Sequence, residues 1–181
     1  MIEILKRIKR ELVYKGSILD IYKDTMQLPN GKTEEWDYVA HRMGAAAVLP
    51  VLPDGRIVMV RQYRNALERE TLEIPAGCRD SLTEDTLVSA SRELEEETGY
   101  RSDDISFLIS LKTTVAFCNE AIDVYLAKNL VKGEQHLDDA EAIEVEIHSL
   151  DELCDMIYKG QLQDSKTVSA ILAYSNLLNK K

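Results

Sequence analysis

The chain has 181 residues, with 32 Asp and Glu against 22 Lys and Arg and a formal net charge of −10 at pH 7. This length is enough for one compact domain with a buried core. The acidic balance argues against a nucleic-acid surface, because binding to a polyanion depends on Lys and Arg that neutralise phosphates. A phosphate-containing ligand would therefore require local basic residues or bound cations.

The three cysteines are odd in number and widely spaced, and they form no CxxC motif. This pattern argues against a disulfide framework and against a zinc cluster. Residues 1–15 mix basic, acidic and apolar side chains, so they contain no uninterrupted apolar stretch for a signal peptide or a membrane span. We therefore expect a cytoplasmic protein with neither a membrane nor a nucleic-acid partner.

The first part of the chain is predicted to form a small antiparallel sheet. Extended runs at 11–14, 18–28 and 35–39 flank the turn sequence Pro29-Asn30-Gly31. An Asn-Gly pair is a strong hairpin signal, because both residues tolerate positive φ. We expect residues 1–42 to form a β arm and residues 43–181 to form the main domain.

A second hairpin is predicted around Pro53-Asp54-Gly55, which separates two apolar runs at 44–52 and 56–63. The pattern changes between Leu82 and Thr98, where the apolar residues recur at helical spacing and Gly99 follows to end the helix. Strand-like runs are then expected at 105–114, 121–127 and 143–148, followed by helices at 150–159 and 165–178. Strands with few helices between them predict an α+β fold.

Four carboxylates lie within five consecutive positions of the first helix. At about 100° per residue, Glu93, Glu96 and Glu97 share one side of the helix and Glu95 points away. Like charges this close repel each other, whereas Mg²⁺ binds a few carboxylates together with waters and phosphate oxygens. The spacing favours a site for Mg²⁺ or Mn²⁺, although a solvated acidic helix face is the alternative that composition alone leaves open.

The flanking residues strengthen the metal interpretation. Leu72-Glu-Ile-Pro-Ala-Gly77, then Glu84, then Arg92-Glu-Leu-Glu-Glu-Glu-Thr-Gly-Tyr100 resembles the Nudix box. Every specified position from Glu84 to Tyr100 fits that pattern. One departure is that six residues, not five, lie between Gly77 and Glu84, so the loop 78–83 is one residue longer. The resemblance implies the Nudix α/β/α sandwich and hydrolysis of a diphosphate bond.

The same resemblance implies roles for particular residues. The expected metal ligands are Glu93, Glu96, Glu97 and the Ala76 carbonyl, which precedes the longer loop. Arg92 would orient the glutamates through a salt bridge, and Glu97 would also count among the catalytic residues. Bound metal would neutralise the phosphate charge and lower the pKa of an attacking water.

Outside the box, Val60-Arg-Gln-Tyr-Arg64 and the β arm resemble the ADP-ribose pyrophosphatase branch of the family. That branch implies a homodimer in which the arms are exchanged. Trp36 would then stack on the adenine of the substrate. The alternative, which the sequence supports equally, is that Trp36 packs in the dimer interface without contacting the substrate. Arg64 and Glu73 are expected substrate contacts, although Arg64 could instead be a surface charge at a strand end.

Two later loops complete the expected site. In residues 113–120, Phe117, Asn119 and Glu120 match the branch, while Val115 and Ala116 replace its Pro-Gly pair. Glu120 is expected to touch the sugar end of the substrate. The acidic loop at 137–145 corresponds to the one that supplies a general base, which we expect to be Glu141 first and Asp139 second, unless the loop is merely solvated.

The sequence thus predicts hydrolysis of a nucleoside diphosphate sugar, most specifically of ADP-ribose to AMP and ribose 5-phosphate. GDP-mannose or another sugar nucleotide is the alternative substrate. A Nudix-like sensor that binds a nucleotide sugar without catalysis is the alternative of another class.

Overall fold

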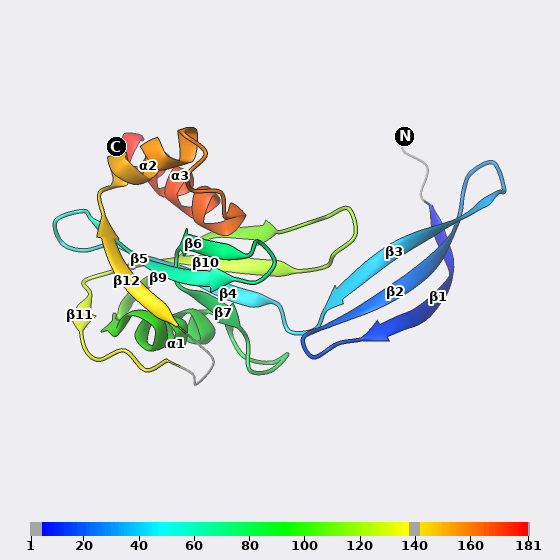
Figure 1. Ribbon diagram of the computed structural model, residues 1–181, viewed down its shortest axis with the longest axis horizontal. Coiled ribbons are helices and arrows are strands. Elements are labelled where there is room, and N and C mark those ends of the chain that lie inside the picture. Colours follow the sequence, from blue (N-terminus) through cyan, green and yellow to red (C-terminus); the bar gives the residue numbers. More distant parts are fainter. Residues whose placement is uncertain (1–4, 138–141, 181) are drawn as a thin grey trace.

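The computed structural model describes residues 5–137 and 142–180 (Figure 1). An N-terminal antiparallel sheet has the order β1-β2-β3 and projects from one end of the molecule, forming the arm. Its strands are β1 (Lys6–Lys15), β2 (Leu19–Gln27) and β3 (Thr33–His41). The predicted turn is present, with Gly31 at a φ of 80° and its N–H donating to the Leu28 carbonyl.

Strand β1 begins at Lys6, earlier than the apolar run at 11–14 predicts. Cross-strand contacts explain the extension. The Arg10 guanidinium donates two hydrogen bonds to Asp24 on β2 and lies 3.9 Å from the ring centroid of Tyr38 on β3. A charged residue thus ties together all three strands of the arm through a salt bridge and a cation–π contact.

The main body contains two larger sheets between helices (Figure 1). One has the order β7-β4-β10-β9, in which β4 and β10 are parallel, and the other has the order β12-β5-β6. A short ribbon pairs β8 with β11. The bounds are β4 (Ala45–Pro50), β5 (Ile57–Arg64), β6 (Arg69–Glu73), β7 (Ala76–Cys78), β8 (Tyr100–Arg101), β9 (Asp104–Lys112), β10 (Ala121–Lys128), β11 (Val131–Lys132) and β12 (Ile143–His148).

The three helices are α1 (Thr86–Thr98), α2 (Leu150–Tyr158) and α3 (Ser165–Asn179). Strand β4 alternates between two cores: Ala46 and Val48 belong to the cluster on the α1 side, and Ala47 and Leu49 to the cluster that includes residues of α2 and α3. Figure 1 shows α1 on one side of the sheets and α2 and α3 on the other. The predicted α/β/α sandwich with an N-terminal β arm is confirmed.

Local capping determines where helix α1 begins and ends. The Asp85 side chain accepts a hydrogen bond from the Leu87 N–H, so the helix begins at Thr86 and not at Leu82. At the other end Gly99 has a φ of 71° and donates its N–H to the Glu95 carbonyl. None of the helices in the described ranges is both long and apolar enough to cross a membrane.

Candidate functional site

The first two residues of β7, Ala76 and Gly77, lie against two glutamates of α1. The Ala76 N–H donates to Glu97 Oε2 over 3.1 Å. At Gly77, a Cβ atom would lie 2.1 Å from Glu93 Oε1, so the Glu93 carboxylate occupies the space that any side chain would need. This close approach gives a physical reason for the glycine of the motif.

Arg92 is the cation of this helix face. Its Nη1 donates to Glu93 Oε1 over 2.8 Å and to Glu96 Oε2 over 2.9 Å, and its Nη2 donates to the Cys78 carbonyl over 3.1 Å. Burial by itself lowers the pKa of the Arg92 guanidinium, but the charge of Glu93 and the hydrogen bond to Glu96 outweigh it, so the pKa lies above its ordinary value. Arg92 therefore stays charged and holds two of the three glutamates.

The three glutamates share one face of α1, as their spacing predicts. Glu93 and Glu97 are 7% and 3% exposed, whereas Glu96 is partly exposed. Within residues 5–137 and 142–180, no three carboxylate, imidazole or thiol side chains already converge as an ion-binding group. The donor set still fits Mg²⁺ or Mn²⁺ chemically, because it consists of hard carboxylate oxygens whose close, partly buried charges a cation would stabilise.

The longer loop at 78–83 is held by hydrogen bonds to the residues around it. The Asp80 N–H donates to Glu84 Oε2 over 2.6 Å, and the Arg79 guanidinium donates to the Met43 carbonyl over 2.7 Å. Strand β7 keeps its register with β4, in which Ala76 pairs with Ala47. The extra residue is thus absorbed in the loop and leaves the Ala76-Gly77 segment beside α1.

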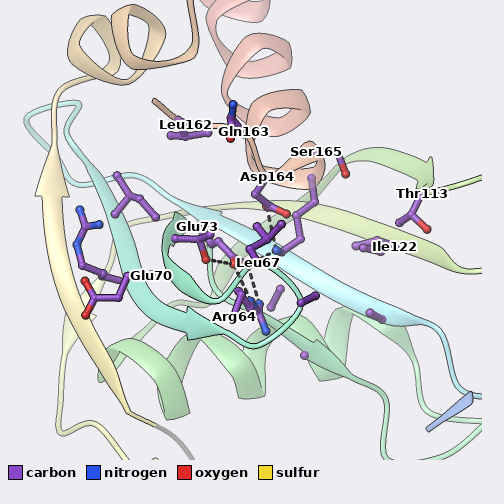
Figure 2. A pocket seen from close by; sticks show the side chains of 18 of the residues that line it. Arg64, Leu67, Glu70, Glu73, Thr113, Ile122, Leu162, Gln163, Asp164 and Ser165 are labelled. Carbon is purple, nitrogen blue, oxygen red and sulfur yellow. Dashed lines mark hydrogen bonds and ion pairs between the residues drawn. The ribbon is translucent and has the colours of Figure 1, made fainter. Parts of the chain in front are cut away.

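A cavity of about 630 Å³ lies next to this segment. Three of the four predicted substrate contacts, Arg64, Glu73 and Glu120, line it together with Ala76. Figure 2 shows Arg64 and Glu73 directed toward one another below Asp164, with Thr113 and Ile122 to one side. Trp36, the fourth predicted contact, is not among the described residues that line the cavity; it lies on β3 and is 42% exposed.

Four charged residues form a cluster in the wall of the cavity: Arg64, Glu73, Asp164 and Lys166, here called the ion cluster. Arg64 Nε and Nη2 donate to the two oxygens of Glu73 over 2.7 and 2.6 Å. The Lys166 ammonium donates to Glu73 and, over 2.9 Å, to Asp164. In the sequence, Lys166-Thr167 resembles a recurring pair of the ADP-ribose pyrophosphatase branch, although helix capping and surface charge explain the pair equally well.

The carboxyl of Glu73 has a strongly lowered pKa. Burial by itself raises it, but the hydrogen bond from Arg64 and the charge of Lys166 lower it from 4.5 to about 2. The folded-state pKa lies below the unfolded one, so this carboxylate stabilises the fold fully above pH 4.5 and loses that contribution as the pH falls toward 2.

Urea unfolding at pH 5 and pH 3 tests this. We expect the parent to lose about 2 kcal/mol more of its free energy of unfolding between these pH values than Glu73→Gln does. At pH 5 the variant should be less stable by about 3 kcal/mol or more, because Lys166 and Arg64 lose their shared carboxylate. Equal pH slopes for the two proteins would contradict the lowered pKa.

Glu120 lies where the cavity meets the base of the arm. It accepts a hydrogen bond from the Thr113 hydroxyl over 2.7 Å, and its other oxygen lies 3.7 Å from His41 Nε2. The loop at 113–120, which contains Glu120, is hydrogen-bonded to β3, because the Val39 N–H donates to the Phe117 carbonyl over 2.7 Å. His41, to which the sequence assigns no role, thus links the end of the arm to the cavity.

The two predicted general bases, Glu141 and Asp139, lie outside the described residues, so their roles stay predictions.

The described face of α1 influences the charge of Arg64 in the cavity. The hydrogen bond to Glu73 is the largest cause that raises the pKa of Arg64, and the charge of Glu97 is a smaller one. The pKa of Arg64 therefore depends on Glu97 of α1 as well as on Glu73 in the ion cluster.

Comparison with known proteins agrees with this arrangement. The model described as "NUDIX domain" matches residues 41–171. The chain is 42% identical to the methanol dehydrogenase activator of Bacillus methanolicus over 92% of this chain and 90% of that protein. It is 37% identical to the ADP-ribose pyrophosphatase of Bacillus subtilis (strain 168), again over 92% and 90%.

Two more distant comparisons extend this result. The ADP-ribose pyrophosphatase of Mycobacterium tuberculosis is 30% identical over 92% of this chain and 81% of that protein. A crystal structure of an ADP compounds hydrolase superposes with a TM-score of 0.89 at 19% identity, covering 99% of this chain and 97% of that one, which shows the shared fold. The chain therefore belongs to the Nudix family, as the motif at 72–100 predicts.

Proposed function

We propose that this Nudix pyrophosphohydrolase hydrolyses ADP-ribose to AMP and ribose 5-phosphate with the help of a divalent cation. The observation that carries the proposal is the juxtaposition of two features. Three glutamates share one face of α1, and Ala76, the first residue of the adjacent strand β7, lines the cavity that contains Arg64 and Glu73. The 37% identity to a protein named ADP-ribose pyrophosphatase supports this choice of substrate.

Glu93, Glu96, Glu97 and the Ala76 carbonyl would hold Mg²⁺ or Mn²⁺. When bound, such an ion supplies positive charge to the phosphorus oxygens and lowers the pKa of a bound water. Arg92 orients Glu93 and Glu96 through its two hydrogen bonds. The base that removes the proton from the attacking water is proposed to be Glu141 or, second, Asp139.

Arg64 is proposed to bind a phosphate oxygen of the substrate. Its pairing with Glu73 uses Nε and Nη2, so Nη1 takes no part in that pairing. The side chain is 41% exposed and lines the cavity. A guanidinium that a carboxylate holds along one edge can present its other N–H groups to a phosphate. Binding then costs little conformational entropy, because the side chain is already fixed. Glu120, which also lines the cavity, is proposed to contact the terminal sugar.

A substrate screen tests the proposal. The purified protein would be assayed with Mg²⁺ or Mn²⁺ on ADP-ribose, ADP-glucose, GDP-mannose, diadenosine polyphosphates and NADH, with products separated by chromatography. We expect the highest kcat/KM for ADP-ribose, the products AMP and ribose 5-phosphate, and no turnover after chelation of the metal. A higher kcat/KM for GDP-mannose would make GDP-mannose the substrate in place of ADP-ribose. Inertness on every compound would favour a non-catalytic sensor.

Activation of a methanol dehydrogenase is a second candidate function. It is favoured by the 42% identity to a protein of that name, over 92% of this chain. The test is to add the protein to a purified methanol dehydrogenase and to measure the rate of methanol oxidation. An increased rate that depends on Glu97 would support this function, and an unchanged rate would remove it.

We further propose that the arm, residues 1–42, exchanges between the subunits of a homodimer. Several apolar side chains of the arm are exposed in the single chain, namely Ile8, Leu12, Val13 and Trp36. Such a surface is typical of an interface, and Trp36 could then reach the adenine in the cavity of the partner. Light scattering should give twice the mass of the chain, and a monomer at assay concentration would contradict the exchange.

We propose a cytoplasmic location because the cysteine thiols are unpaired. Cys78, Cys118 and Cys154 are all free. Free thiols persist in a reducing compartment, whereas secreted proteins of this size commonly pair them.

A further inference from the structure

Lys166 is a buried cation that has no role in the reaction proposed above. The residue is 7% exposed, although it lies in the first turn of α3. Its ammonium donates to Glu73 on β6 and to Asp164, the N-cap of the same helix. A buried ammonium is costly unless carboxylates compensate its charge, so this lysine is held in place by both.

The ion cluster is balanced in charge. Arg64 and Lys166 carry two positive charges, and Glu73 and Asp164 carry two negative ones. Without Lys166, Arg64 would face both carboxylates alone. The negative charges of Glu73 and Asp164 would then offset the positive charge of Arg64. An incoming anion would be attracted to Arg64 less strongly.

The ion cluster is also fixed relative to the α1 side of the cavity. The Thr167 hydroxyl donates to Asp164 over 2.6 Å and accepts from the Ile74 N–H over 2.9 Å. Ile74 lies directly between Glu73 and the Pro75-Ala76 segment. The start of α3 therefore holds the chain two residues before Ala76, whose N–H donates to Glu97.

We infer that Lys166 is a positioning residue for diphosphate binding: by neutralising Glu73 and Asp164, it leaves Arg64 free to attract the diphosphate. This inference rests on the proposed function, in which Arg64 receives a phosphate oxygen. It predicts that the charge of Lys166, and not its packing, determines the affinity of the cavity for an ADP-sugar.

The test measures binding of a probe that is not hydrolysed, α,β-methylene ADP-ribose, by titration calorimetry at fixed Mg²⁺. We expect Lys166→Met to raise the Kd about tenfold. Adding Asp164→Asn to that variant should restore most of the affinity, because it removes one negative charge while Asn still caps α3. Lys166→Arg should bind nearly as the parent does. Lys159 pairs with Asp155 at the surface and is not among the described residues that line the cavity, so Lys159→Met controls for the loss of a positive charge elsewhere.

Each result decides for or against the inference. An unchanged Kd in Lys166→Met, or a double variant that binds no better than the single one, would overturn it, because lost packing is not repaired by Asp164→Asn. If circular dichroism shows that Lys166→Met does not fold, Asp164→Asn alone decides: it should lower the Kd severalfold, and an equal or higher Kd would overturn the inference.

Failure of the proposed function gives a different result. A parent protein that binds the probe but hydrolyses none of the substrates would remove the enzymatic proposal, and the comparison of Kd values would still decide the role of Lys166. A parent protein that does not bind the probe would overturn both.

Discussion

Replacing Glu97 with Gln is expected to lower kcat on ADP-ribose by about a thousandfold or more, while the protein stays folded. Glu97 is 3% exposed and accepts a hydrogen bond from the Ala76 N–H over 3.1 Å, so it joins α1 to the start of β7 beside the cavity. Gln keeps an oxygen that can accept this hydrogen bond but removes the negative charge. The free energy of unfolding should therefore change by only about 1–2 kcal/mol, whereas the affinity for the divalent cation should fall strongly.

Glu95→Gln is the matched control for this experiment, because Glu95 belongs to the same helix, is exposed and points away from the other glutamates. It removes the same charge and should leave kcat within about twofold of the parent, as expected for a surface substitution. Steady-state kinetics with a titration of Mg²⁺ and Mn²⁺ would measure both variants. Full activity in Glu97→Gln would show that the proposed metal site is wrong.

The helix face and the family could be predicted from the sequence because they depend on local spacing. Glu93, Glu96 and Glu97 share one side of any α-helix that contains them, whatever surrounds it. The hairpin at Asn30-Gly31 was likewise set by two adjacent residues. These features needed no knowledge of distant contacts.

The ion cluster could not be predicted in this way, because its members are far apart in the chain. Glu73 and Lys166 are separated by 93 residues, and neither position alone shows that the two side chains meet. The start of α1 at Thr86 depended on which of several polar residues before the helix serves as its cap.

Gly77→Ala is the second substitution for which we expect a large effect. The new Cβ would lie 2.1 Å from Oε1 and 2.3 Å from Cδ of Glu93, closer than nonbonded atoms can approach. The φ of Gly77 is not positive, so alanine adds no backbone strain. The methyl group would therefore displace the Glu93 carboxylate from Arg92 and from the shared helix face.

The expected result is a fall in kcat/KM of about a hundredfold with a loss of about 1 kcal/mol or less in the free energy of unfolding. The fold can accept the methyl group because the clash involves the end of a flexible side chain and not the backbone. A double-mutant cycle with Glu93→Ala isolates this cause, since residues that act through one contact are not additive. In the Glu93→Ala background, Gly77→Ala should lower kcat/KM no further. A second, full loss in that background would mean that Gly77 acts on the backbone of the loop and not on Glu93.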